Sequence, residues 1–119
     1  ITPLKAVRIV GYAQDKSVYV GSGNTGTLSI ANNLPPSFLE PRYSQALRNH
    51  SPDGFAWGYP GSGPAQLALA ILLRYIPANI AQEHYQDFKR EYLVALPPDS
   101  DFDITINIYE WLEKKLKGE

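Results

Sequence analysis

The sequence predicts a single α+β domain, residues 1–119, in which a small N-terminal antiparallel β-sheet packs against about three C-terminal α-helices. Three observations lead to this fold class. Segments with strand character come first, helical periodicity dominates from Pro64 onward, and prolines separate the helical segments. A chain of 119 residues is long enough to bury one core and too short for two.

Two segments near the N-terminus are expected to pair as a β-hairpin. Lys5–Tyr12 and Ser17–Gly21 are rich in valine and tyrosine, and the four residues between them have turn chemistry. Thr27–Ile30 alternates polar and apolar residues and is expected to be a third strand. The sheet should therefore contain this hairpin and one or two further strands.

The middle of the chain is expected to be mostly irregular. Prolines and asparagines in Asn32–Pro41 predict an extended loop, and Ser44–Arg48 is expected to form a short helical turn. A Pro-Asp-Gly sequence follows, which is typical of a tight turn. Phe55–Tyr59, directly after it, is expected to be a short strand that carries Trp57 and Tyr59 on one face.

Three helices are expected in the second half of the chain. Pro64 suits the first position of a helix because its missing N–H would have no partner there, and Pro77 ends this helix. The residues between them are apolar on every side, which predicts a helix at the centre of the core. Asn79–Leu96 has the spacing of an amphipathic helix capped by Asn79, and Thr105 is expected to cap a last helix.

Composition and charge exclude several classes of function. Eleven basic and twelve acidic side chains give a net charge of −1, without a run of like charge that would indicate binding of nucleic acid. Disulfides and cysteine nucleophiles are excluded because the chain has no cysteine. The longest apolar stretch, Ala65–Leu73, is too short to cross a membrane, and the N-terminus lacks the pattern of a secretory signal. We expect a cytoplasmic protein without a membrane partner.

Two motifs resemble ligand sites, but their context does not support that interpretation. Residues 21–26 match the dinucleotide pattern G-x-G-x-x-G, which requires a helix directly after it, whereas a strand is expected here. Asp99, Asp101 and Asp103 alternate as in a calcium loop, but Ile104 occupies the position that needs glycine. We interpret the first motif as a hairpin connection and the second as a solvated turn, and we expect no cofactor and no metal.

The best candidate site is the glycine turn Gly61–Gly63 at the start of the central helix. Free N–H groups at the start of a helix, together with the helix dipole, favour an anion. The two glycines would let the backbone approach a ligand, and Ser62 could donate its hydroxyl. A structural explanation is also open, in which the glycines supply a positive φ and Ser62 or Gly63 caps the helix. No lysine follows as it would in a phosphate loop.

The candidate ligand-binding residues lie in this turn or are expected to surround it: Asn49, His50, Asp53, Trp57, Tyr59, Gly61, Ser62, Gly63 and Gln66. Among them are a histidine, an aspartate and a serine, the residue types of a catalytic triad. The sequence around Ser62 nevertheless lacks the G-x-S-x-G pattern of a nucleophile elbow, so no catalytic residue is assigned.

Motifs between Leu47 and Leu112 form a further pattern: Leu47–Phe55, Trp57–Tyr59, Gly61–Ala70, His84–Glu91, Leu96-Pro97 and Trp111-Leu112. This pattern resembles a family of small proteins from bacteria and their phages, the domain of unknown function 6166. The resemblance implies an organisation of the chain but no activity. Ala56 stands where the family usually has an acidic residue and Pro60 where it usually has a glycine. A catalytic role for that acid would make this chain inactive.

Three hypotheses of function follow. The first is a non-enzymatic binding module for a small anionic or nucleotide-like ligand, and the resemblance to phage proteins adds a role in phage–host conflict by analogy. The second is a structural or interaction protein that acts through protein–protein contacts or homo-oligomerisation, with Tyr43, Tyr59 and Tyr75 on its surface. The third is a small hydrolase that uses Ser62 or His50. The first is favoured, so we do not expect an enzyme.

Overall fold

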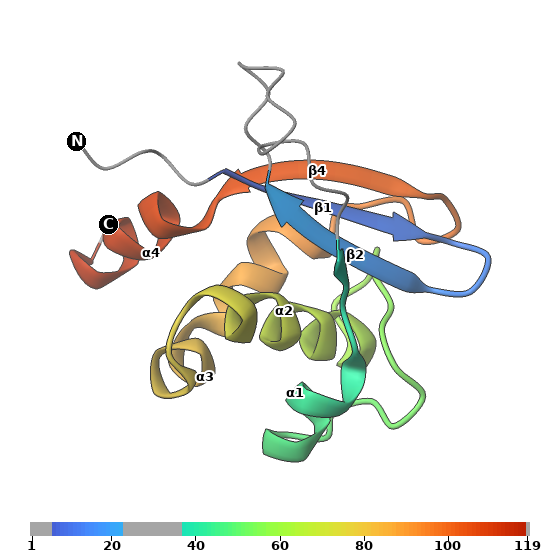
Figure 1. The fold of residues 1–119 in the computed structure, drawn as a ribbon, viewed down its shortest axis with the longest axis horizontal. Coiled ribbons are helices and arrows are strands. Elements are labelled where there is room, and N and C mark those ends of the chain that lie inside the picture. The colour runs from blue at the N-terminus through green and yellow to red at the C-terminus, as the bar shows by residue number, and fades with distance from the viewer. Residues whose placement is uncertain (1–5, 23–36, 119) are drawn as a thin grey trace.

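The computed structural model describes residues 6–22 and 37–118, which form a four-stranded antiparallel sheet and four α-helices (Figure 1). The strands are β1 (Ala6–Tyr12), β2 (Ser17–Ser22), β3 (Ser37–Phe38) and β4 (Phe102–Asn107). The helices are α1 (Pro41–Leu47), α2 (Ser62–Tyr75), α3 (Ala78–Phe88) and α4 (Ile108–Leu116), and a π-helical turn, η2 (Lys89–Leu93), extends α3. The predicted α+β fold class is confirmed.

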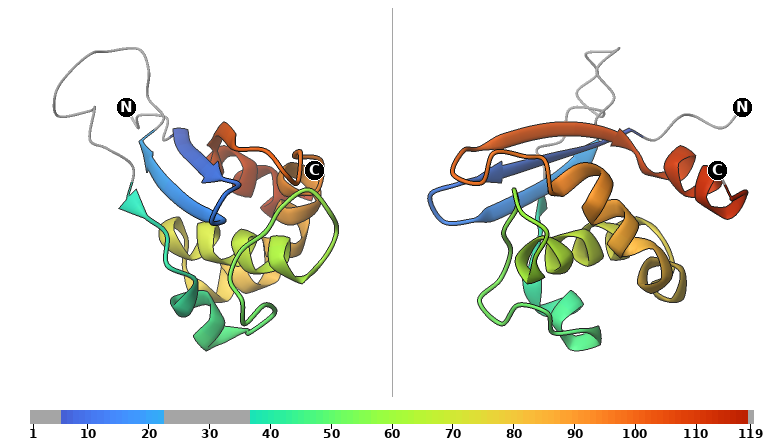
Figure 2. Two further views of the ribbon diagram at one scale, coloured as in Figure 1. Left: turned by 90° about the vertical axis from the view of Figure 1, so that its right-hand side faces the viewer. Right: turned by 180° about the vertical axis from the view of Figure 1, so that it is seen from behind.

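The helices lie on one side of the sheet, so one face of the sheet is in the core and the other faces solvent (Figure 2). The strand order is β3-β2-β1-β4, and β1 and β2 form the predicted hairpin. Val7 and Ile9 of β1 are buried, whereas Arg8 and Tyr12 are exposed. This alternation follows from the two-residue period of a strand. The expected strand Thr27–Ile30 lies outside the described residues.

The fourth strand replaces the turn that we expected before the last helix. Residues 102–107 pair with β1, with Ile9 opposite Ile104, so Thr105 is a strand residue and not a helix cap. The physical reason is period-two burial, because Phe102 and Ile106 face the core. α4 begins after Asn107, whose side chain accepts a hydrogen bond from the Glu110 N–H at 3.0 Å.

Two charged side chains connect β1 and β4 on the solvent face of the sheet. The Arg8 Nε donates to Asp103 Oδ1 at 2.9 Å. This hydrogen bond, together with the positive charge of Arg8, lowers the pKa of the Asp103 carboxyl below its usual value. One aspartate of the expected acidic turn is therefore a β4 residue bound to a neighbouring strand.

The expected strand Phe55–Tyr59 is absent from the structure, where this segment is irregular. Gly58 has a φ of +87°, which interrupts the alternation of an extended strand. Trp57 is therefore completely buried, while Tyr59 is 45% exposed, so the two side chains do not share a face. The Trp57 ring packs edge-to-face on Phe102 with a centroid distance of 4.7 Å. The segment therefore contacts β4 through Trp57 and the start of α2 through Ala56, which lies beside Gly63.

The central helix lies where the sequence predicts it and is buried, but it begins at Ser62, so Pro64 is its third residue and not its first. Ten consecutive residues of α2, Gly63–Leu72, are buried, and the helix ends at Tyr75, two residues before Pro77. The all-round apolar pattern is explained by contacts with α1 on one side and α3 on another. Among residues 6–22 and 37–118, the helices are too short or too polar to cross a membrane.

Candidate functional site

Gln66 is the one polar residue in the buried stretch of α2, and its amide binds the segment that follows α1. Its Oε1 accepts hydrogen bonds from the backbone N–H groups of His50 (2.8 Å) and Ser51 (3.0 Å). Its Nε2 donates to Ser44 Oγ (2.8 Å) and to the Arg48 carbonyl (3.1 Å). Both amide protons and both acceptor positions are used. Gln66 therefore fixes this segment against α2.

The candidate residues before the glycine turn have separate surroundings. His50 Nε2 lies 2.6 Å from the hydroxyl of Tyr85 on α3. Asp53 is exposed in a turn closed by the Gly54 N–H and the Ser51 carbonyl (3.2 Å), and it faces α1 across a shallow depression. Within the part of the chain that the structure describes, no hydrogen bond connects the His50 ring with Asp53 or Ser62. The triad geometry is not formed there.

Asn49 and Trp57 also lie apart from one another. Asn49 is exposed at the end of the segment that follows α1. The indole of Trp57 is in the core, where its Nε1 donates to the Ser100 carbonyl at 3.1 Å. Lys16 Nζ lies 4.6 Å from the centre of the indole ring.

The glycine turn is located as predicted, but one structural reason given for its glycines is wrong. α2 begins at Ser62, and Gly61 has a φ of −132°, so no positive φ is required. The glycines are needed for close packing instead. A Cβ on Gly61 would clash with the ring of Tyr59, and a Cβ on Gly63 would lie 2.5 Å from the Cβ of Ala56. The Tyr59 ring therefore packs directly on the turn.

The N–H groups in the first turn of α2 have no partner within the helix. This turn has neither a side-chain cap nor an acidic residue, and the expected cap by Ser62 or Gly63 is replaced by Gly61. The Ala65 N–H donates to the Gly61 carbonyl at 3.2 Å, which closes the first helical turn. The N–H groups of Ser62 and Gly63 precede this bond, and Pro64 has no N–H. Ser62 is exposed beside Tyr59, so the structure brings together the residues of the turn and Tyr59.

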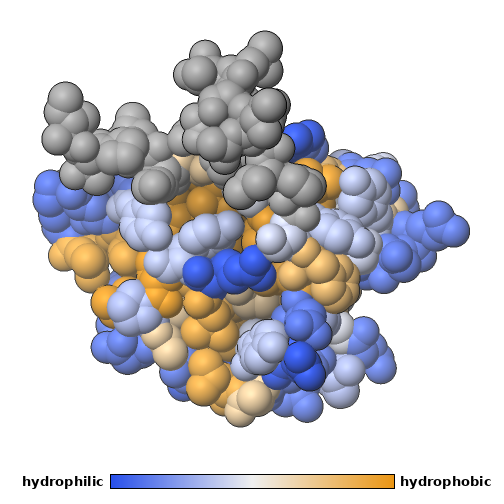
Figure 3. All heavy atoms as spheres, in the orientation of Figure 1, coloured by the Kyte–Doolittle hydropathy of each residue, from blue (hydrophilic) through white to orange (hydrophobic). Residues whose placement is uncertain are grey.

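A hollow that the sequence did not predict lies between β3, α1 and the second half of α2, and we call it the β3 hollow. Its volume is about 160 Å³. Its lining residues are Phe38, Leu39, Glu40, Tyr43, Ser44, Ala70, Leu73 and Arg74. Leu39, Ser44 and Ala70 are buried, whereas Phe38 and Tyr43 are 49% and 62% exposed. The hollow therefore has a buried floor and an aromatic rim, and Figure 3 shows apolar surface on the face that carries β3 and α2.

The charges at the β3 hollow do not cancel. The Arg42 Nε lies 3.2 Å from Glu40 Oε1, so Glu40 already has a partner. Arg42 also donates to the Tyr43 hydroxyl at 3.0 Å, a bond that orients the exposed ring. Arg74 is exposed and forms no ion pair with any residue in 6–22 or 37–118. One positive charge at the hollow is therefore uncompensated.

Comparisons with known proteins give one match. The model of a family of unknown function, DUF6166, matches residues 19–114. No curated protein and no solved structure matches the chain. The matched range includes the glycine turn and all the residues that line the β3 hollow.

Proposed function

The chain belongs to DUF6166, a family of unknown function, and we propose that it is a non-enzymatic interaction domain that binds another protein at the β3 hollow. The observation that carries this proposal is the buried apolar floor beneath the exposed rings of Phe38 and Tyr43. Aromatic side chains around an apolar pocket are typical of the centre of a protein interface. The hollow can accept one side chain of a partner.

The hydrogen bonds of the polar candidate residues favour a binding function over an enzymatic one. The amide of Gln66 is saturated, and the ring of His50 is held against Tyr85. A hydrolase would need a base within hydrogen-bond distance of its nucleophile. Ser62 has no such neighbour among the described side chains, which argues against the proposed hydrolase.

A selection with random peptides displayed on phage tests the interaction domain. The wild-type protein serves as bait, and the Ala70→Leu variant, in which a larger side chain fills the hollow, serves as counter-bait. We expect peptides that are enriched on the wild type and bind Ala70→Leu at least tenfold more weakly. Thermal unfolding of Ala70→Leu shows whether this variant is folded. A second variant, Tyr43→Ala, removes an exposed ring at the rim and tests the same hollow without adding a side chain to the core. Peptides that bind all three proteins equally, or no enrichment, would contradict the proposal.

A second candidate function is the binding of a small anion at the start of α2, and a specific observation favours it. The N–H groups of Ser62 and Gly63 carry the positive end of the helix dipole without a carboxylate nearby in the first turn. Phosphate and nucleoside phosphates are the chemical class that such donors bind.

Ser62→Asp tests this candidate because its carboxylate would occupy the position of the anion. The substitution should stabilise the protein by about 0.3–1 kcal/mol through the helix dipole. Inorganic phosphate and ATP should raise the melting temperature of the wild type and not that of Ser62→Asp, measured in a thermal shift assay at constant ionic strength. Ser100→Asp, on an exposed turn, is the control for added charge. If neither ligand raises the melting temperature of the wild type, or if both raise it equally for the wild type and Ser62→Asp, this site would be excluded.

A further inference from the structure

We propose that the partner of the β3 hollow is an extended acidic segment of another protein, which binds as an additional strand along the edge of β3. It would place one apolar side chain in the hollow and a neighbouring carboxylate on Arg74. This inference rests on the proposed interaction function and specifies the conformation and chemistry of the bound segment.

The edge of β3 has backbone groups that point away from the sheet. β3 is the outermost strand beside β2 in the sheet that the described residues form. The Leu39 N–H donates to the Val18 carbonyl at 2.8 Å, and Phe38 stands opposite Tyr19. Because hydrogen-bonding direction alternates along an antiparallel strand, the N–H and C=O of Phe38 point away from β2. An incoming strand could pair with them.

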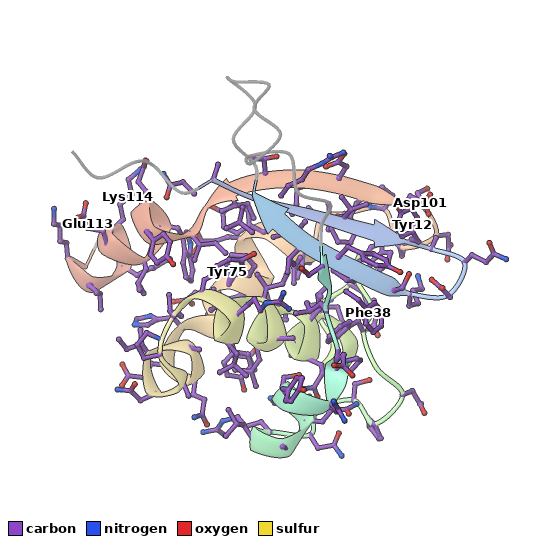
Figure 4. All side chains as sticks on the ribbon, in the orientation of Figure 1. Tyr12, Phe38, Tyr75, Asp101, Glu113 and Lys114 are labelled. Carbon is purple, nitrogen blue, oxygen red and sulfur yellow. The ribbon has the colours of Figure 1, made fainter. Side chains whose placement is uncertain are left out.

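The β3 hollow lies along this edge. Phe38, Leu39 and Glu40 are consecutive, and all three line it. Of these three, only Phe38 belongs to β3, and Leu39 and Glu40 continue the chain toward α1, so the hollow begins at the end of the strand and extends toward α1 and α2. Figure 4 shows Phe38 where β3 passes α2. A segment paired with Phe38 would therefore run past the mouth of the hollow.

The lining of the hollow selects an apolar side chain. Its far wall is formed by Ala70 and Leu73 of α2, and its space exists because Ala70 carries only a methyl group. A volume of about 160 Å³ suits one aliphatic or aromatic side chain. Burial of such a group would contribute roughly 1.5–3 kcal/mol, part of which offsets the entropy lost on binding.

The charge at the hollow selects an acid. Glu40 is neutralised by Arg42, and the guanidinium of Arg74 is available at the mouth. A guanidinium binds a carboxylate through two parallel N–H donors, which gives both affinity and geometric selectivity. A segment with aspartate or glutamate near its apolar side chain would therefore be favoured over a basic one.

The test uses synthetic peptides taken from the phage selection, measured by fluorescence polarisation. We expect the selected sequences to carry Asp or Glu within two positions of an apolar residue. Changing that acid to its amide should weaken binding about tenfold, as should Arg74→Gln, because a hydrogen bond between two charged groups is lost. Lys114→Gln, on α4 and far from Phe38 in Figure 4, removes an equal charge and should leave binding unchanged.

Hydrogen exchange tests the added strand separately. The amide of Phe38 should become protected when the peptide binds, while the amide of Leu39 is already bonded to Val18. An unchanged Phe38 amide would overturn strand addition, and binding that ignores both Arg74→Gln and the acid-to-amide change would overturn the acidic ligand. Either result would leave the proposed function standing if binding still depends on Ala70. Sedimentation should show a monomer, and a dimer that Ala70→Leu dissociates would overturn the inference in favour of a second copy of the chain.

Discussion

Replacement of Gln66 by leucine is expected to lower the free energy of unfolding by about 3 kcal/mol or more. Leucine has a similar volume, so the main loss is polar. The Ser44 hydroxyl, the Arg48 carbonyl and the N–H groups of His50 and Ser51 would each lose a partner. Among the described residues, the Ser51 N–H would have no remaining partner, whereas the His50 N–H and the Arg48 carbonyl keep their bond to each other at 3.1 Å and Ser44 Oγ keeps its bond to the Pro41 carbonyl. The loss is therefore that of four hydrogen bonds at about 0.5–1.5 kcal/mol each, and the half-buried N–H groups recover part of it from water.

Urea denaturation of the variant measures this loss, with Gln86→Leu as the matched control. Gln86 lies on α3, is half-buried and has no side-chain hydrogen bond to a described residue. Its substitution should change stability by less than about 0.5 kcal/mol. Similar free energies of unfolding for the two variants would show that the four hydrogen bonds of the Gln66 amide do not stabilise the protein.

The same substitution should affect the β3 hollow. Ser44 Oγ receives one hydrogen bond from Gln66 and donates another to the Pro41 carbonyl at 2.9 Å. Ser44 also forms part of the floor of the hollow. Loss of Gln66 would therefore loosen α1 against α2 and weaken the binding of the selected peptides, with faster exchange of the His50 and Ser51 amides as an independent readout.

The sequence was informative where a local pattern determines the structure. Alternation in the first strands predicted the hairpin, and an all-round apolar segment ending near Pro77 predicted the central helix. The strand β4 was missed because the acidic residues around it resemble a solvated turn. Alternation of Phe102, Ile104 and Ile106 was the available signal, since such a pattern indicates a half-buried strand.

The candidate site was less predictable because its residues come from distant parts of the chain. The β3 hollow needs Phe38 and Tyr43 to meet Ala70, and no local pattern specifies that contact. Gln66 did carry a signal. A glutamine in a segment that is apolar on every side must be paired when it is buried, which indicates a structural hydrogen-bond centre as readily as a ligand contact.

Gly58→Ala is expected to be at least as destabilising as Gln66→Leu, at about 3 kcal/mol or more. Gly58 has a φ of +87°, which an L-residue rarely adopts. A Cβ there would lie 2.6 Å from the Leu96 carbonyl oxygen and 2.6 Å from Pro98 Cα. Both atoms belong to the backbone, so rotation of a side chain cannot relieve the contact.

Gly54→Ala separates the cost of placing an L-residue at positive φ from the cost of the steric clash. Gly54 also has a positive φ, +108°, but the nearest atom to an added Cβ is Pro41 Cγ at 3.9 Å, an ordinary contact. This control should lose only the backbone cost, about 1–2 kcal/mol, in the same urea experiment. Equal losses of stability for Gly58→Ala and Gly54→Ala would mean that the segment carrying Leu96 and Pro98 can move away from the added Cβ at little cost in free energy. A larger loss of stability for Gly58→Ala would show that the segment carrying Leu96 and Pro98 is rigidly packed on Gly58. We expect this result because the Gly58 N–H donates to the Leu93 carbonyl at 2.9 Å and the neighbouring Trp57 is completely buried.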